Sequence, residues 1–336
     1  MVESRAFGAH FDSVDDVIHW GHNVVFGGAV ANLLNQSGVT ARLLAGPAMV
    51  EELAQVAAIP ADKMARMLDF MLANEMLERD EAGAYVSTHR LGVMHEAAAF
   101  FPITHITNAC ATQLLPALQQ GQTPFAARFG APVFEYYRAH PAAAADFGRY
   151  MGLMTRRVER FLLGQHRFHP FATVADIGGS MGDLLLAVLG EYPGTRGVLF
   201  DRPDVVELAR PGVAAAPLAD RVELVGGSFF DAVPAADLYL LKQILHDWDD
   251  AECREILRCI RAAMNPGARV AVIDHVLDDV PTANESQATD IAMMLWDTGR
   301  ERKLAEFVAL FAACGFAIDR VTPNPSGHSV LELVPA

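Results

Sequence analysis

The sequence predicts an α/β fold in which a doubly wound, mostly parallel sheet follows a mainly helical N-terminal region. Three observations lead to this prediction. From Thr173 onward, apolar segments of strand length alternate with segments of helix length, which is typical of a parallel sheet with helices on both faces. This region begins with an apolar run that ends in an acidic residue and a glycine turn, at residues 174–182. The first 100 residues instead show helical periodicity and one short hairpin.

Residues 1–100 are predicted to form a first, mainly helical domain with a small hairpin. Asp62 is expected to cap a helix with an apolar face of methionines and leucines. Segments 77–79 and 84–86 flank a turn at Gly83. Helices followed by a hairpin are typical of a winged helix, a fold used by many DNA-binding regulators. The expected recognition helix mixes acidic and basic side chains, which favours a packing or dimerisation role.

Residues 101–172 are expected to connect the two halves and to contribute to a ligand pocket. Residues 142–163 are predicted to form a long helix, with Pro141 at its start. Met151 belongs to a set of methionines at helical spacing along this helix. Such methionines are usually part of a core, and lining a ligand pocket is the alternative.

The third region, residues 173–336, is predicted to contain the sheet. The clearest helix covers residues 249–264, where Asp249 and Glu252 form a possible capping box before an apolar stripe. Because the strands alternate with helices, a ligand is expected beyond the carboxyl ends of the strands. Strands are expected at residues 173–177, 197–200, 222–225, 238–241, 269–273, 317–321 and 329–334.

The glycine turn indicates the kind of ligand. Gly178 and Gly179 follow Asp176, but their spacing does not fit the G-x-G-x-x-G pattern of dinucleotide binding. The chain also has no G-x-x-x-x-G-K-[ST] motif, which argues against a P-loop. Asp201 ends the next predicted strand, where a carboxylate can accept both hydroxyls of a ribose. A ligand with a ribose but no phosphate is therefore favoured, and S-adenosylmethionine fits that description.

A second constellation follows the fourth and fifth predicted strands. His246 lies in the loop after the fourth strand, where a histidine can take a proton from a substrate hydroxyl. Asp274 follows the fifth strand, and a carboxylate there can hydrogen-bond the histidine and fix its tautomer. Glu301 is a second carboxylate that could hydrogen-bond the histidine. The alternative interpretation of residues 298–302 is a charged loop exposed to solvent.

Composition limits the other classes of function. The net charge of −15 makes the chain a poor partner for nucleic acid or an anionic membrane. Its four cysteines form no C-x-x-C pair, and no dense His/Asp/Glu cluster indicates a metal site. Neither a signal peptide nor an apolar segment of membrane-spanning length is recognised. A cytoplasmic location is therefore expected.

Four motifs resemble those of small-molecule O-methyltransferases of the caffeic acid and hydroxyneurosporene type. The resemblance spans nearly the whole chain. It implies a Rossmann-like, seven-stranded class I methyltransferase domain, preceded by a winged-helix-like domain through which the chain forms a homodimer. It also implies an aromatic or polyketide-like acceptor. The motifs are Asp-Ile-Gly-Gly at 176–179, Leu-Lys-Gln-Ile-Leu-His-Asp-Trp at 241–248, Asn-Pro-Gly at 265–267 and Gly-Arg-Glu-Arg at 299–302.

The resemblance also implies roles for individual residues. His246 would be the general base that removes the hydroxyl proton, with Asp274 and Glu301 beside it. No metal is required. The acceptor pocket would be walled by Met151, Met293 and Trp296, and the cofactor would contact Asp176, Gly178, Gly179, Asp201, Ser228, Phe229 and Lys242.

Two residues depart from the family's pattern. Ser228 stands where the family usually has an aspartate that accepts a hydrogen bond from the adenine amino group. A neutral hydroxyl accepts a weaker hydrogen bond than a carboxylate does. Ser180 replaces a third consecutive glycine. Two alternatives stay open: non-methylating chemistry with the same cofactor (hydroxylation, decarboxylation or cyclisation), and a DNA-binding regulator that senses a small ligand.

Overall fold

The computed structural model describes residues 13–281, 284–324 and 327–336. It divides into two compact units, Met1–Ile106 and Thr107–Ala336. The sequence places a boundary at residue 100, close to this division. The further boundary expected at residue 172 stays a prediction.

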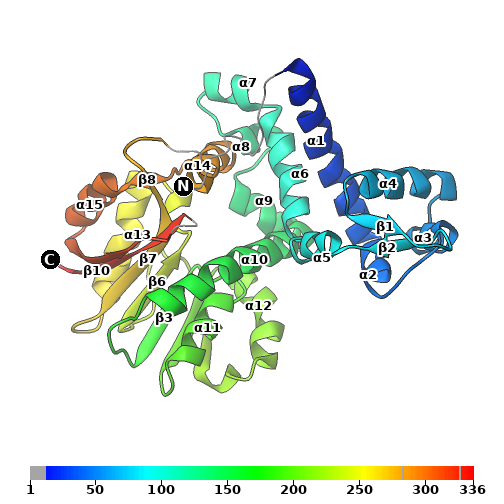
Figure 1. Ribbon diagram of the computed structural model, residues 1–336. Helices are drawn as coiled ribbons and strands as arrows, with labels where there is room; N and C mark the ends of the chain where they lie inside the picture. The colour runs from blue at the N-terminus through cyan, green and yellow to red at the C-terminus, as the bar shows by residue number, and fades with distance from the viewer. Residues whose placement is uncertain (1–12, 282–283, 325–326) are drawn as a thin grey trace. The chain divides into compact units, whose positions relative to one another are not determined.

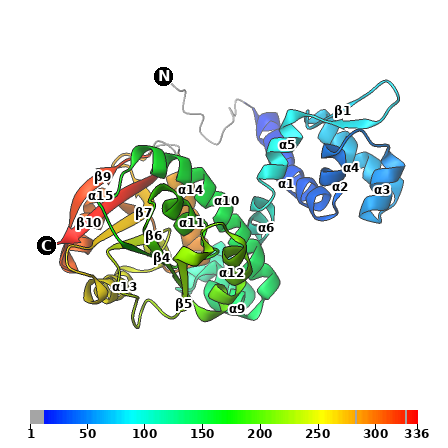
Figure 2. The same cartoon turned by 90° about the horizontal axis from the view of Figure 1, so that it is seen from below.

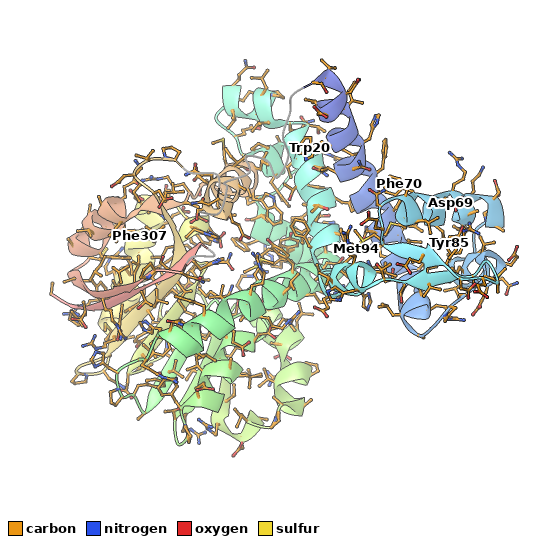
Figure 3. The ribbon with its side chains drawn as sticks, viewed as in Figure 1. Trp20, Asp69, Phe70, Tyr85, Met94 and Phe307 are labelled. Atoms are coloured by element: carbon orange, nitrogen blue, oxygen red, sulfur yellow. The ribbon has the colours of Figure 1, made fainter. Side chains whose placement is uncertain are left out.

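The first unit contains helices followed by a two-stranded hairpin, as predicted. Strands β1 (Leu77–Arg79) and β2 (Tyr85–Ser87) pair antiparallel around the Gly83 turn. The Tyr85 hydroxyl donates a hydrogen bond of 2.8 Å to Asp69 and so ties the hairpin to helix α4 (Figure 3). The helices are α1 (Val14–Gln36), α2 (Val39–Leu44), α3 (Val50–Ala57), α4 (Ala61–Ala73), α5 (His89–Glu96) and α6 (Phe100–Ala111), which continues into the second unit.

The predicted cap of α4 is wrong. The residue before the helix is Pro60, whose side chain makes no capping hydrogen bond. Asp62 lies one residue inside the helix, in its first turn, where a carboxylate interacts favourably with the helix dipole. Its apolar face is as expected, since Met64, Leu68 and Met71 are buried.

The second unit begins with short helices that lead into a long one. Helix α10 (Pro141–Gln165) starts at a proline in its first turn, as the sequence predicts. The short helices before it are α7 (Leu114–Gln119), α8 (Pro124–Phe129) and α9 (Val133–Ala139).

A central sheet follows, with the strand order β5-β4-β3-β6-β7-β10-β9 (Figure 1). The strands from β5 to β7 are parallel, and β10 pairs antiparallel with both β7 and β9. All seven predicted strands are present. Their bounds are β3 (Thr173–Ile177), β4 (Arg196–Asp201), β5 (Val222–Gly226), β6 (Leu238–Lys242), β7 (Arg269–Leu277), β9 (Phe316–Thr322) and β10 (His328–Pro335), and the short β8 (Arg302–Lys303) pairs with the end of β7.

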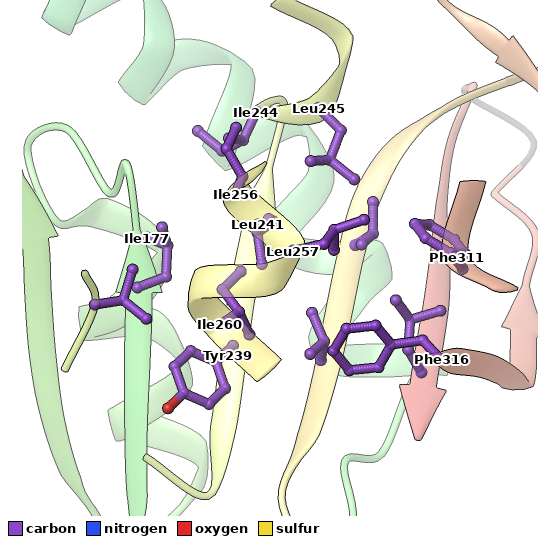
Figure 4. Packing of buried hydrophobic residues seen from close by; sticks show 14 of the residues in the cluster. Ile177, Tyr239, Leu241, Ile244, Leu245, Ile256, Leu257, Ile260, Phe311 and Phe316 are labelled. Carbon is purple, nitrogen blue, oxygen red and sulfur yellow. The ribbon is translucent and has the colours of Figure 1, made fainter. Parts of the chain in front are cut away.

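Helices cover both faces of this sheet (Figure 2). One face packs against α10, α11 (Asp183–Glu191) and α12 (Pro203–Ala215). The other packs against α13 (Asp250–Ala263) and α15 (Leu304–Ala313), where Ile256, Leu257 and Phe311 meet the strands (Figure 4). Asp249 and Glu252 form the predicted capping box at the start of α13. Helix α14 (Glu285–Trp296) lies between β7 and β8 in the chain.

Strand β7 is longer than the sequence suggests. It continues past Ile273 to Leu277, because its extension pairs with β10 on one side and with β8 on the other. Asp274 therefore lies inside a buried strand rather than in the loop after it. Among the residues described, no helix has both the length and the apolar character needed to cross a membrane.

Candidate active site

The glycine turn folds closely onto the neighbouring strand. The Gly178 amide donates a hydrogen bond of 2.8 Å to the carbonyl of Phe200, at the end of β4. Gly178 has a φ of 68°, and a Cβ there would lie 2.4 Å from the Ile244 side chain. Glycine is thus required for both conformation and space. Ser180 also adopts a positive φ, of 51°, and its amide donates a hydrogen bond of 2.8 Å to Asp201.

A cavity of about 220 Å³ opens at the carboxyl ends of the strands, beside this turn. Its wall is more apolar than polar, since aromatic rings from α9, α10 and the loop after β5 line it. A concave, mostly aromatic site with few polar groups is typical of a small-molecule site. Of the residues predicted from sequence, those in its wall are Met151, Gly178, Asp201, Ser228, Phe229 and Lys242.

A smaller hollow adjoins this cavity and holds the remaining predicted cofactor residues. Asp176 and Gly179 line it together with Lys242. Burial raises the pKa of Asp176 to about 7, although Lys242 opposes the shift. Burial lowers the pKa of Lys242 to about 8, again opposed by Asp176. Within the described part of the chain, Asp176 Oδ2 has no hydrogen-bond partner, so this oxygen is available to a ligand.

Several aromatic wall residues were not predicted. The rings of Phe134 and Trp248 stack with centroids 5.6 Å apart. The guanidinium of Arg202 donates a hydrogen bond of 2.9 Å to the Phe134 carbonyl, which joins α9 to the end of β4. Phe147 stacks on Tyr137 with centroids 4.8 Å apart. Trp248 belongs to a recognised motif, but nothing in the local pattern around Phe134 marks it as a wall residue.

His246 is brought together with Glu301, which lies 55 positions later in the sequence. The histidine is buried in a single 3-10 turn, Leu245–Asp247, after β6. Its Nδ1 lies 2.8 Å from Glu301 Oε1. A carboxylate can only accept a hydrogen bond, so Nδ1 donates and Nε2 is the nitrogen left to accept a proton. Nε2 faces Asp247, whose Oδ1 lies 3.4 Å away.

The loop that carries Glu301 is held tightly against this turn. A Cβ on Gly299 would lie 1.9 Å from the His246 carbonyl oxygen, so only glycine fits there. Arg302, which is buried, donates hydrogen bonds of 2.8 and 2.9 Å to the carbonyls of Leu245 and Trp248. Gly299, Glu301 and Arg302 of the Gly-Arg-Glu-Arg motif are therefore buried, and only Arg300 fits the alternative of a solvated charged loop.

The charges around His246 determine its proton affinity. Burial alone would lower the pKa of His246, but the carboxylates of Glu301 and Asp247 outweigh it and raise the pKa to about 10. Burial raises the pKa of Asp247 to about 6, opposed by His246. These carboxylates therefore stabilise the positive charge that the histidine gains when it takes a proton.

The predicted hydrogen bond between Asp274 and His246 is wrong. Within the described residues, neither oxygen of Asp274 has a hydrogen-bond partner. Because β7 continues through Asp274, this side chain is fixed within the sheet while the later loop brings Glu301 to Nδ1. Asp274 still acts on His246 through its charge. Burial raises the pKa of Asp274 to about 7, opposed by His246.

The other predicted residues lie outside the cavity wall. Trp296 packs against Phe147 with centroids 6.1 Å apart, so one ring separates it from the cavity. Met293 is half-buried on the same helix, α14. The acceptor contacts of both residues stay predictions. Across the described residues, no group of three or more His, Cys, Asp or Glu side chains is arranged to hold a metal ion.

Comparison with known proteins places this geometry in a family. The model of the O-methyltransferase domain family matches residues 112–317. The phenazine O-methyltransferase of Lysobacter antibioticus is 40% identical over 223 residues, which cover 66% of this chain. The match spans 65% of that relative, slightly less than two thirds of its length.

Solved structures superpose on nearly the whole chain. The crystal structure of LaPhzM superposes with a TM-score of 0.89 at 30% identity, covering 96% of this chain and all of that one. The SAH-bound form of CalO1, a methyltransferase in calicheamicin biosynthesis, superposes with a TM-score of 0.77 at 30% identity and covers 97% of this chain and all of that one. The family match covers more than half of the chain, and the chain therefore belongs to the O-methyltransferase domain family.

Proposed function

We propose that this protein transfers a methyl group from S-adenosylmethionine to a hydroxyl of a small aromatic molecule, with His246 as the general base. The observation that carries the proposal is the contact between His246 Nδ1 and Glu301, beside a cavity at the carboxyl ends of the strands. It leaves Nε2 as the proton-accepting nitrogen.

The cavity and its adjoining hollow suit this cofactor. Asp201 lies at the end of β4 and accepts one backbone hydrogen bond on each oxygen, which orients its carboxylate and leaves further lone pairs for ribose hydroxyls. Phe229 offers a ring face to the adenine, and Ser228 a hydroxyl. Asp176 Oδ2, which has no partner in the described structure, and Lys242 suit the ammonium and carboxylate of the methionine part.

The chain's own residues supply position and proton removal. When bound, S-adenosylmethionine supplies a methyl group that is already activated on its sulfonium sulfur. Glu301 orients the imidazole through Nδ1, and Nε2 takes the hydroxyl proton of the acceptor. The aromatic wall excludes water around the reacting oxygen, and fixed orientation accounts for much of the acceleration.

The acceptor is proposed to be a planar aromatic or polyketide-like molecule. Phe134, Tyr137, Phe147 and Trp248 give flat apolar walls, which stack favourably on an aromatic ring. The relative from Lysobacter antibioticus, by its name, acts on a phenazine. A monohydroxylated phenazine is therefore the first acceptor to test, followed by simpler phenols.

His246→Ala tests the assignment of the base. We expect the variant to bind S-adenosylhomocysteine normally while turnover falls at least ~100-fold, the scale of a general base. Product is measured by mass spectrometry, and cofactor affinity by calorimetry. His105→Ala, which removes an exposed histidine from α6, is the matched control. Near-normal turnover of His246→Ala would contradict the role of His246.

We also propose a homodimer formed through the first unit. Helix α1 exposes large apolar side chains along its length, including Val17, Val25 and Phe26, and exposed apolar surface of this extent usually marks an interface. We expect Val25→Asp to halve the mass in solution measured by light scattering. Val308→Asp, on the exposed surface of α15, should leave the mass unchanged.

We also propose a cytoplasmic location, since all four cysteines are free.

A further inference from the structure

Each turnover of the proposed reaction leaves one proton on a buried side chain. The acceptor oxygen gains a bond to the methyl carbon, the carbon–sulfur bond breaks with its electron pair remaining on sulfur, and the hydroxyl proton moves to His246 Nε2. The base must lose that proton before it can act again. The His246 side chain is only 5% exposed, so water has little direct access to it.

The groups that surround His246 differ in their access to the cavity. Glu301 and Asp274 are buried at 1% and 0% exposure, and Glu301 holds the opposite ring nitrogen. Lys242 lines the cavity but carries positive charge and donates its hydrogen bond, of 2.5 Å, to Gln243. None of these three groups offers a route from Nε2 to water.

Asp247 combines the two required properties. Its Oδ1 lies 3.4 Å from His246 Nε2, the nitrogen that takes the proton. It also lines the cavity, and its side chain is 19% exposed. We propose, resting on the proposed function, that Asp247 relays the proton from His246 to the solvent of the cavity after methyl transfer. The N–H bond at Nε2 breaks, an O–H bond forms on Asp247, and water then removes the proton.

The pKa of Asp247 lies between that of an exposed aspartate and that of His246, so transfer to Asp247 is less unfavourable than transfer to an exposed aspartate. Burial raises the pKa of Asp247 to about 6, so the carboxylate accepts a proton more readily than an exposed aspartate does and still releases it at neutral pH. The pKa of His246, about 10, means that water alone would remove the proton slowly. Asp297 contributes a further negative charge near both groups, and its Oδ1 accepts a hydrogen bond from its neighbour Thr298.

Asp247→Asn separates the relay from a merely structural role, because it keeps shape and removes the proton acceptor. The assay uses a monohydroxylated phenazine and compares a single turnover with steady-state turnover. Loss of the Asp247 charge lowers the pKa of His246, so the variant and the wild type are each compared at the pH of their own plateau. There we expect the first turnover to slow far less than steady-state turnover, which falls ~10-fold or more in dilute buffer. Added acetate or imidazole should restore steady-state turnover in proportion to its concentration. Asp297→Asn, which removes a nearby charge without touching Nε2, should show no such dependence.

Two results would overturn the relay. One is equal slowing of the first and later turnovers without rescue by buffer, which indicates a role in folding or binding. The other is unchanged steady-state turnover. If the wild-type protein methylates neither the phenazine nor simpler phenols, the proposed function fails and the relay fails with it. Wild-type activity combined with an unaffected Asp247→Asn variant overturns the relay alone.

Discussion

The wall of the proposed cofactor cavity and the surroundings of His246 differ in the kinds of residue that form them. The cavity wall consists of backbone turns and aromatic rings, with few polar groups. The surroundings of His246 consist of buried charges: Asp274 and Glu301 are at most 1% exposed. The two regions adjoin at the turn after β6, where Lys242, Asp247 and Trp248 belong to the cavity wall and His246 lies behind it.

This difference indicates that the two regions determine different properties, cofactor affinity and turnover rate. Apolar walls and close backbone turns already contact the bound cofactor before reaction, so substitutions that disturb the cofactor contacts should change its affinity first. A buried network of charges acts on the proton that moves only during reaction, so it mainly sets the rate. Substitutions in the two regions should therefore separate cofactor affinity from turnover.

Glu301→Gln is expected to have the larger effect of the two substitutions that test this division. Glu301 is the strongest of the charges that raise the pKa of His246, so its loss lowers that pKa. In the wild type, the base form of His246 increases as pH rises toward about 10. The pH dependence of kcat/KM should therefore rise to its plateau at a lower pH in the variant. The plateau itself should fall ~10-fold or more, because a weaker and less well oriented base remains.

The control for this experiment is cofactor affinity. S-adenosylhomocysteine should bind Glu301→Gln as it binds the wild type, because Glu301 does not line the cavity among the described residues. A pH profile that stays in place while the plateau falls would contradict the electrostatic role of Glu301. A large loss of affinity would contradict the separation of the two regions.

Most of the fold could be predicted from the sequence because its signals are local. The seven strands are short segments rich in apolar residues, and their alternation with helices determines the architecture. The error in the cap of α4 was local, but the end of β7 was missed because distant partners determine it. Strand β7 extends past Ile273 because β8 and β10 pair with its end, and neither pairing leaves a signal in the strand itself.

Prediction of the site from the sequence also failed where contacts between distant residues matter. The glycine turn, Asp201 and His246 follow strands that were recognised, so the topology brings them to one edge of the sheet. The choice between Asp274 and Glu301 as the partner of His246 could not be made, because both carboxylates are near and only side-chain direction separates them. Phe134 was missed because its place in the wall depends on the Arg202 contact, between residues 68 positions apart.

Gly179→Ala tests the binding side of the comparison and is expected to have the smaller effect. A Cβ there would lie 2.4 Å from the Leu199 side chain and 2.8 Å from the carboxyl carbon of Asp176, so both side chains must move. Movement of Asp176 changes the hollow that adjoins the cavity. Overpacking of this kind costs about 1–3 kcal/mol, which corresponds to roughly a 5- to 150-fold loss if it falls on binding alone.

We expect the affinity for S-adenosylhomocysteine, measured by calorimetry, to fall about 10-fold, near the low end of that range because Leu199 can partly give way. Turnover at saturating cofactor should change little, since the contacts of His246 are untouched. Gly190→Ala is the matched control, because no atom lies within 4 Å of a Cβ at that position. If Gly179→Ala instead lowers saturated turnover as strongly as Glu301→Gln does, the turn positions the reacting methyl group as well as binding it, and the two regions act as one.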